Sequence, residues 1–117
     1  MERITSQDGS KYYGRMNDPT SSAYVKGPCG DEMEFYLVIN DNIITDITFY
    51  TDGCITTQVC GAMTAQLAKG KQIWEALDIS PKKVMDLLND VPADHKHCSI
   101  LAVSTLYKAI AEYLLRP

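Results

Sequence analysis

The sequence lacks any apolar run that approaches the roughly 18 residues needed to span a bilayer. It also lacks a secretory signal at its start, because residues 1–8 do not contain a basic segment followed by an apolar one. Neither a membrane-spanning segment nor an export signal is predicted. We therefore expect a cytoplasmic protein that has no membrane partner.

Positive charge is scarce, with 11 Lys and Arg against 15 Asp and Glu and a formal net charge of −4. Binding to nucleic-acid phosphates needs a surplus of Lys and Arg, so we expect no nucleic-acid partner. Glycine and proline are also few, and a composition of 45% hydrophobic and 22% charged residues is typical of a folded protein. A chain of 117 residues has room for one core. We expect a flexible N-terminal lead-in over residues 1–28 and a single domain over residues 29–117.

The four cysteines do not form short clips of the kind found in zinc fingers, nor the closely spaced run of a ferredoxin. Two disulfides would require an oxidising compartment, and nothing in the sequence directs the chain to one. Reduced thiols are the better expectation. The sequence also lacks a phosphate-binding glycine loop and a serine-nucleophile motif.

Two strands are predicted first along the chain. Apolar residues alternate over residues 33–39 and again over 43–49, and Asn40-Asp41-Asn42 between them tolerates a tight turn. The first strand is predicted to direct Met33, Phe35, Leu37 and Ile39 to one face, and the second Ile43, Thr45, Ile47 and Phe49. A third short strand or a tight loop is expected to carry the chain from there to Cys54.

Helical periodicity appears in the second half of the chain. It predicts helices over about residues 57–69, from Ser80-Pro81 onward, and over about 96–115, with Gly70 ending the first and a short apolar stretch at 73–77. The predicted inward residues are Val59, Cys60, Met63 and Leu67, then Val84, Leu87 and Leu88, and finally Ile100, Val103, Leu106, Ile110 and Leu114. Strands followed by helices predict an α+β fold, with a small three-stranded antiparallel sheet packed against a layer of helices.

Three of the cysteines lie at boundaries between these predicted elements. Cys29 is in a Gly-Pro-Cys-Gly-Asp loop, Cys54 precedes a helix, and Cys98 lies in the first turn of the last helix. A metal site needs deprotonated sulfurs from separate elements, and a helix N-terminus favours the thiolate. With Asp31 and His97 beside them, these cysteines favour a metal or cluster site over three unrelated thiols.

Cys60 differs, because it shares the apolar face of its predicted helix, where an inert cysteine is expected. A core role is favoured for Cys60, and an accessory ligand role is kept as the alternative. A thiol enzyme is a further alternative, since Cys98 beside His97 at a helix start has the setting that activates a thiolate. The sequence offers no clear third group that would orient such a pair.

Four segments together resemble the IscU/NifU-type iron–sulfur cluster assembly scaffold: residues 27–33, 52–54, 69–71 and 97–102, within a match over about residues 17–117. The resemblance implies that Cys29, Cys54 and Cys98 hold a labile [2Fe–2S] or [4Fe–4S] cluster, with Asp31 or His97 as the non-thiolate ligand. A weaker oxygen or imidazole ligand would leave an exchangeable position, which suits transfer. The small-residue run usual after the second cysteine is replaced here by residues 55–60.

The resemblance also implies partners. A cysteine desulfurase would deliver sulfur as persulfide, with Cys98 as the expected acceptor and Cys29 as the second choice, and iron–sulfur acceptor proteins would receive the cluster. The chain would then be a scaffold and not an enzyme, and a transient homodimer could bridge one cluster. The alternative is a SufU-like sulfur acceptor that stimulates a desulfurase and binds Zn²⁺ tetrahedrally through Cys29, Asp31, Cys54 and Cys98.

Overall fold

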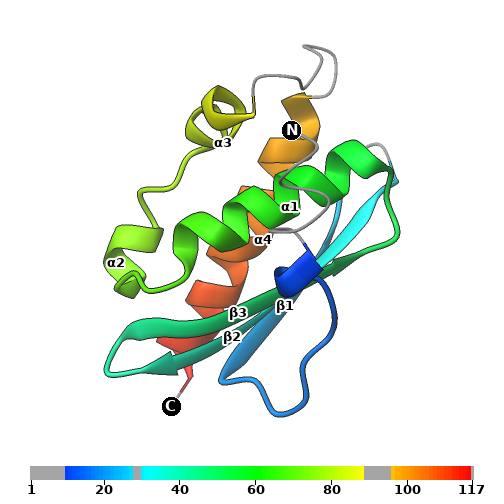
Figure 1. Cartoon of the computed structure of the whole chain (residues 1–117). Coiled ribbons are helices and arrows are strands. Elements are labelled where there is room, and N and C mark those ends of the chain that lie inside the picture. Colours follow the sequence, from blue (N-terminus) through cyan, green and yellow to red (C-terminus); the bar gives the residue numbers. More distant parts are fainter. Residues whose placement is uncertain (1–9, 28–29, 89–95, 117) are drawn as a thin grey trace.

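The structure is a computed structural model that describes residues 10–27, 30–88 and 96–116. Its elements are the 3₁₀ helix η2 (Ser10–Tyr12), the strands β1 (Ser21–Lys26), β2 (Glu32–Asn40) and β3 (Ile43–Thr51), and the helices α1 (Ile55–Ala68), α2 (Ile73–Ala76), α3 (Pro81–Leu87) and α4 (Lys96–Leu115). The strands come first and the helices come after them (Figure 1). The predicted α+β fold is confirmed.

The sheet has three antiparallel strands in the order β1-β2-β3. Strands β2 and β3 form the predicted hairpin, and its turn uses Asp41 and Asn42 at φ 53° and 64°, in the left-handed region that these residue types tolerate. The third strand of the sheet precedes this hairpin, whereas the sequence predicts a third strand or a loop after it. Strand β3 leads directly into α1 through a tight connection at Asp52 and Gly53.

Strand β1 lies within residues 1–28, the segment expected as a lead-in. Its Ala23 and Val25 are partly buried against the core, whereas Ser22 and Tyr24 face solvent. With one β-branched residue among six, this edge strand carries too weak a signal to be predicted from its sequence. The sheet therefore begins before residue 29, while the flexibility of the N-terminal residues stays a prediction.

Strand β3 departs from the predicted alternation, whereas β2 buries its four predicted apolar residues. In β3 the buried residue is Ile44, while Thr45 is exposed. The cause is a shift of register, because Val38 pairs with Asp46 but the next residue of β2 pairs with Ile44. One extra residue in β3 reverses the faces on either side of it. The prediction that Ile43 and Thr45 share the buried face is therefore wrong.

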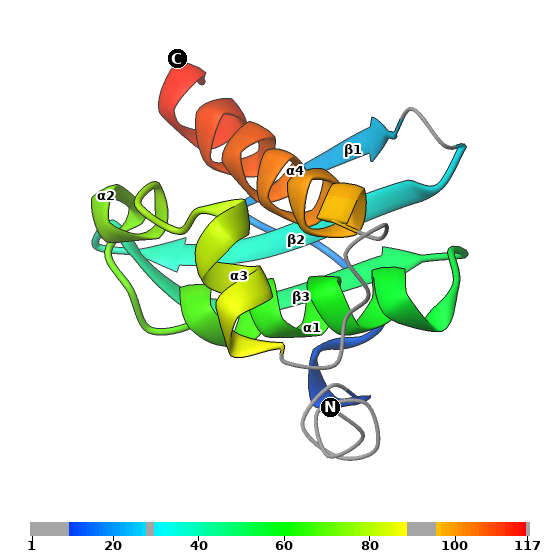
Figure 2. The same ribbon diagram turned by 90° about the horizontal axis from the view of Figure 1, so that it is seen from above.

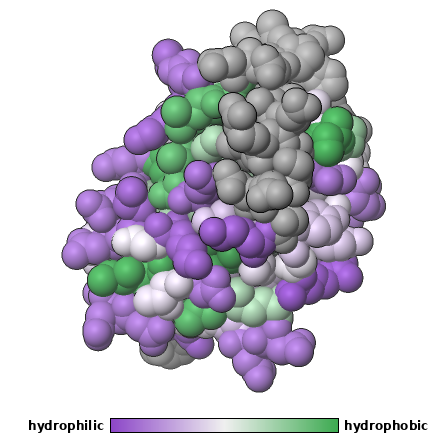
Figure 3. All heavy atoms as spheres, in the orientation of Figure 1, coloured by the Kyte–Doolittle hydropathy of each residue, from purple (hydrophilic) through white to green (hydrophobic). Residues whose placement is uncertain are grey.

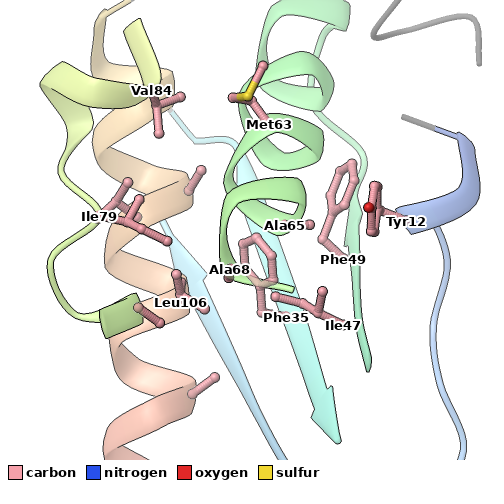
Figure 4. Packing of buried hydrophobic residues seen from close by; sticks show 14 of the residues in the cluster. Tyr12, Phe35, Ile47, Phe49, Met63, Ala65, Ala68, Ile79, Val84 and Leu106 are labelled. Carbon is pink, nitrogen blue, oxygen red and sulfur yellow. The ribbon is translucent and has the colours of Figure 1, made fainter. Parts of the chain in front are cut away.

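Helices α1 and α4 cover one face of the sheet, α1 over β3 and α4 over β1 and β2 (Figure 2). The core lies between these layers. Figure 4 shows Phe35 and Ile47 of the strands close to Ala68 of α1, with Leu106 of α4 on the other side of that helix and Tyr12 of η2 against Phe49. This packing fixes where α1 and α4 begin relative to the end of β3, and the candidate site lies at that end.

The predicted helix ends are confirmed in three places. Ser80 Oγ accepts a hydrogen bond from the backbone N–H of Lys83 at 3.1 Å, and Pro81 comes next at the first helical position. Gly70 has a φ of 86°, which a glycine adopts at little cost after a helix. Helix α4 has the predicted bounds, Lys96–Leu115.

Three of the predicted inward residues are wrong, because Leu87, Ile100 and Leu114 are 48%, 53% and 44% exposed. For Ile100 and Leu114, the prediction relied on the large apolar residues of α4, whereas this helix also packs through the small buried residues Ala102 and Ala109. Leu87 is the last residue of α3, where Val84 is the buried residue. On the face shown in Figure 3, hydrophobic side chains form separate patches among hydrophilic ones. Apolar side chains scattered singly on a surface need no partner to explain them.

Among the described residues, α4 over His97–Leu115 is the one helix with the length and apolar composition of a membrane span. Half of that segment is buried inside the molecule, where it contributes to the core. A core helix of a folded domain meets the same two criteria, so the composition of α4 is explained by its packing.

Candidate functional site

The candidate site lies where β3 passes into α1. The backbone of Cys54 is extended, with φ −69° and ψ 175°, and Cys54 is the residue that precedes the first turn of α1. Gly53 and Asp52 separate it from the strand, so the sulfur lies at the end of the sheet and at a helix N-terminus. The Cys54 side chain is exposed to solvent. This is the boundary position that the sequence predicts for it.

The helix N-terminus acts on the Cys54 thiol. The backbone N–H of Thr57 is the main reason that the pKa of this thiol lies below its ordinary value, and the N–H of Thr56 acts in the same direction. Partial burial opposes the shift, and so does the carboxylate of Asp31. The net effect favours the thiolate, which is the form that binds metals and reacts as a nucleophile.

Cys98 approaches from the other helix. It lies in the first turn of α4 and is buried, with 1% of its surface exposed. Its sulfur is 3.3 Å from Thr57 Oγ1, and the Cys54 sulfur is 3.7 Å from the same oxygen. The two sulfurs therefore both contact one hydroxyl group, although they are 44 positions apart in the sequence.

Asp31, immediately before β2, completes this group. Its Oδ2 accepts a hydrogen bond of 2.8 Å from Thr57 Oγ1. A Cβ added to Gly53 would lie 3.0 Å from that same carboxylate oxygen, so the missing side chain at Gly53 leaves the space that Asp31 occupies. Three residues predicted as ligands, Asp31, Cys54 and Cys98, thus meet at Thr57.

Cys60 has the environment of a core residue. It is fully buried on α1, and burial raises the pKa of its thiol to about 12, with Cys98 and Cys54 acting in the same direction. Both effects oppose formation of a thiolate at neutral pH. An accessory ligand role for Cys60 stays a prediction that this environment does not favour.

The structure does not test the rest of the predicted ligand set. Cys29 lies outside the described residues, and His97 is partly buried beside Cys98 in the first turn of α4. Within residues 10–27, 30–88 and 96–116, no group of three or more His, Cys, Asp or Glu side chains could hold a metal ion as the chain stands. The complete ligand set, including Cys29 and the choice between Asp31 and His97, stays a prediction.

Thr57 belongs to the site although the sequence does not predict it there. Its hydroxyl is buried and contacts Asp31, Cys54 and Cys98, which come from different parts of the chain. A signal was present, because Thr57 is a polar residue one helical turn after Cys54, on a helix whose next turns bury apolar residues. Its partners could not be deduced without the packing of α1 against α4.

Known proteins are similar in sequence to this chain over most of its length. The model of the NifU-like N terminal domain family matches residues 8–117. The iron–sulfur cluster assembly scaffold protein IscU 1 of Archaeoglobus fulgidus is 40% identical over 101 residues, which cover 86% of this chain and 66% of that relative. The scaffold protein IscU of Escherichia coli K12 is 34% identical over 99 residues, which cover 83% of this chain and 77% of that relative.

A solved structure shows the same fold. The N-terminal part of a nitrogen-fixing NifU-like protein from Brucella abortus aligns with a TM-score of 0.71 at 18% identity, over 98% of this chain and 94% of that one. The match of the family model covers nearly the whole chain, and the sequence relatives are named as scaffold proteins of iron–sulfur cluster assembly. The chain therefore belongs to the NifU-like N-terminal domain family.

Proposed function

We propose that this protein is a scaffold for iron–sulfur cluster assembly, which accepts sulfur and iron at Cys29, Cys54 and Cys98 and transfers the cluster to acceptor proteins. Family membership supports this proposal, as do the names of the relatives, which are scaffold proteins. The observation that carries it is the meeting of Asp31, Cys54 and Cys98 around one buried hydroxyl.

The chemistry of the group fits such a cargo. Iron–sulfur clusters are held by thiolates, and Cys54 at the start of α1 has the lowered pKa that favours one. The carboxylate of Asp31 would add an oxygen ligand, which exchanges more readily than a fourth cysteine. A site of this composition holds a cluster and can also release it. The chain would act as a carrier and not as an enzyme.

The proposal includes the partners that this role requires. A cysteine desulfurase would supply sulfur as persulfide, with Cys98 as the acceptor, and apo iron–sulfur proteins of the cytoplasm would receive the cluster. Whether the cargo is [2Fe–2S] or [4Fe–4S], and whether a transient homodimer bridges it, depends on ligands that include Cys29. Nucleic acids and membranes have no part in this role.

Anaerobic reconstitution with ferrous iron, sulfide and a thiol tests the proposal. We expect visible absorption from a protein-bound cluster, which a chelator removes and an apo acceptor protein takes up. Replacing Cys29, Cys54 or Cys98 with serine should abolish the stable cluster, whereas Cys60→Ser, the matched control on α1, should lower stability and leave cluster binding intact. A Cys98→Ser protein that assembled and transferred the cluster normally would contradict the ligand assignment.

A zinc-bound sulfur acceptor is the second candidate, with Cys29, Asp31, Cys54 and Cys98 as a tetrahedral set. It is favoured by the donor set itself, because thiolates and a carboxylate are ligands that Zn²⁺ also accepts. Metal content after purification and after reconstitution separates the two candidates. One equivalent of zinc that resists replacement by the cluster, together with stimulation of a desulfurase, would favour the second.

A further inference from the structure

The hydroxyl of Thr57 is the centre of the candidate site, and its hydrogen bonds define its role. A hydroxyl has one proton and two lone pairs. The hydroxyl donates to Asp31 Oδ2 at 2.8 Å. Its contacts with the sulfurs of Cys98 at 3.3 Å and Cys54 at 3.7 Å are longer, and in them either atom can be the donor. Among the described residues, the bond to Asp31 is therefore the shortest contact of this oxygen, and a hydrogen bond to a carboxylate group is of the stronger kind.

Other buried threonines of the same helices behave differently. Thr64 of α1 and Thr105 of α4 donate to the backbone carbonyl four residues earlier, at 2.8 and 2.7 Å. For Thr57 the corresponding carbonyl is that of Gly53, which accepts the side-chain amide of Gln58 at 3.2 Å instead. The Thr57 hydroxyl donates to Asp31 and not to a carbonyl of its own helix.

The packing around Thr57 restricts its side chain. Thr57 is completely buried, and a β-branched side chain has few rotamers in a helix. A Cβ at Gly53 would be 3.0 Å from Asp31 Oδ2 and from Cβ and Cγ2 of Thr57. The backbone at position 53 therefore lies close to both partners of this hydrogen bond.

We propose that Thr57 is the positioning residue that fixes the Asp31 carboxylate beside Cys54 and Cys98, and so sets how tightly the site binds metal. This inference rests on the proposed function, because it assigns Asp31 as the oxygen ligand. Thr57 itself is not a ligand and acts through Asp31. Hydrogen-bond partners that orient a ligand typically change metal affinity by about 10- to 100-fold when they are removed.

Thr57→Val tests the proposal, because it removes the hydroxyl and keeps the shape. The probe is Co²⁺ alone, under anaerobic conditions, with affinity measured from its sulfur-to-metal charge-transfer and ligand-field absorption. We expect the dissociation constant to rise by about 10-fold or more in Thr57→Val. We expect near-normal values in Thr57→Ser, which restores the hydroxyl, and in Thr105→Val, which removes a buried hydroxyl elsewhere. Wild-type affinity in a folded Thr57→Val protein would overturn the inference.

A second measurement identifies the route through Asp31. In an Asp31→Ala background, Thr57→Val should change the dissociation constant by less than about 2-fold, because the group that it positions is gone. An effect as large as in the wild-type background would show that Thr57 acts through another group, and would overturn the inference. A thermal melt of each variant shows whether it is folded. If Thr57→Val is unfolded, Thr57→Ala, which also lacks the hydroxyl, is measured in its place against Thr57→Ser.

The failure of this inference is distinguishable from failure of the proposed function. If the wild-type protein neither binds Co²⁺ nor assembles a cluster, the proposed function is wrong. If the wild type does both and Thr57→Val matches it, only the role of Thr57 is wrong.

Discussion

A single methyl group added at Gly53 should loosen the proposed metal site and leave the fold almost unchanged. Gly53 does not have a positive φ, so alanine can adopt its backbone conformation. The added Cβ would lie 3.0 Å from Asp31 Oδ2 and equally close to Cβ and Cγ2 of Thr57, whereas ordinary contacts are 3.4–4 Å. One of these neighbours must therefore move by a few tenths of an ångström.

The energies of the substitution and the burial of the two neighbours indicate which neighbour moves. Replacing glycine with alanine stabilises a protein by about 0.4–1 kcal/mol where the backbone allows it, since the unfolded chain loses freedom. Overpacking costs about 1–3 kcal/mol in a rigid core, and less where an atom can give way. Thr57 is locked in α1, whereas Asp31 is only partly buried. We expect Asp31 to be displaced, with an unfolding free energy within about 1 kcal/mol of wild type.

The assay compares Co²⁺ affinity with urea unfolding for the same proteins. Gly53→Ala should weaken Co²⁺ binding by about 10-fold, as expected when a ligand loses its orientation. Gly27→Ala is the matched control, because its Cβ would approach the described residues no closer than 3.5 Å, at Asp31 O and Leu101. A folded Gly53→Ala protein with wild-type affinity would refute the reasoning, and so would equal losses in the two variants.

Three further predictions concern the thiols, the core and the surface. In native protein at neutral pH, iodoacetamide should modify Cys54 far faster than Cys60. Cys54 is exposed and has a lowered pKa, whereas Cys60 is buried and its pKa is raised to about 12. Equal rates of modification, measured by mass spectrometry, would contradict this order. Gly61→Ala should destabilise the fold by about 0.5–2 kcal/mol in urea unfolding, because an added Cβ 2.7 Å from the Phe49 ring outweighs the helix propensity gained. Arg15 Nε donates a hydrogen bond of 3.0 Å to Glu34 Oε1, and this bond is the chief reason that the pKa of Glu34 is lowered. The contribution of Glu34 to stability is therefore present above its ordinary pKa of 4.5 and is lost as pH falls through the folded value. The stability difference between wild type and Glu34→Gln should be under about 1 kcal/mol and should shrink below pH 4.5; a difference that grows on acidification would contradict it.

The parts of the fold that the sequence predicts are those set by local residue order. Alternation gives β2, the turn residues Asp41 and Asn42 give the hairpin, and a serine–proline start gives α3. The parts that it misses depend on a partner strand. Strand β1 is recognised only through its pairing with β2, and the extra residue of β3 only through the shift between Val38 and Ile39.

In the candidate site too, some features depend on local sequence and others depend on how distant parts of the chain pack together. The positions of Cys54 and Cys98 at helix starts depend on local sequence, and both predictions agree with the elements observed. The role of Thr57 depends on the approach of α1 to α4 and on the loop before β2, which bring the Cys98 sulfur and the Asp31 carboxylate to one oxygen. The spacing of these residues along the chain does not predict that their side chains contact one oxygen.

The two cysteines of the α1 region show why position within an element is more informative than spacing. Cys54 and Cys60 are six residues apart, yet the first precedes the helix and the second lies within it. At the N-terminus of α1, backbone N–H groups that have no partner within the helix lower the pKa of Cys54. Burial in the core raises the pKa of Cys60. Thr57 lies between them in the first turn, where its hydroxyl reaches the site and its backbone N–H acts on Cys54. About 1.7 turns of helix thus separate the thiol with the lowered pKa from the thiol with the raised one.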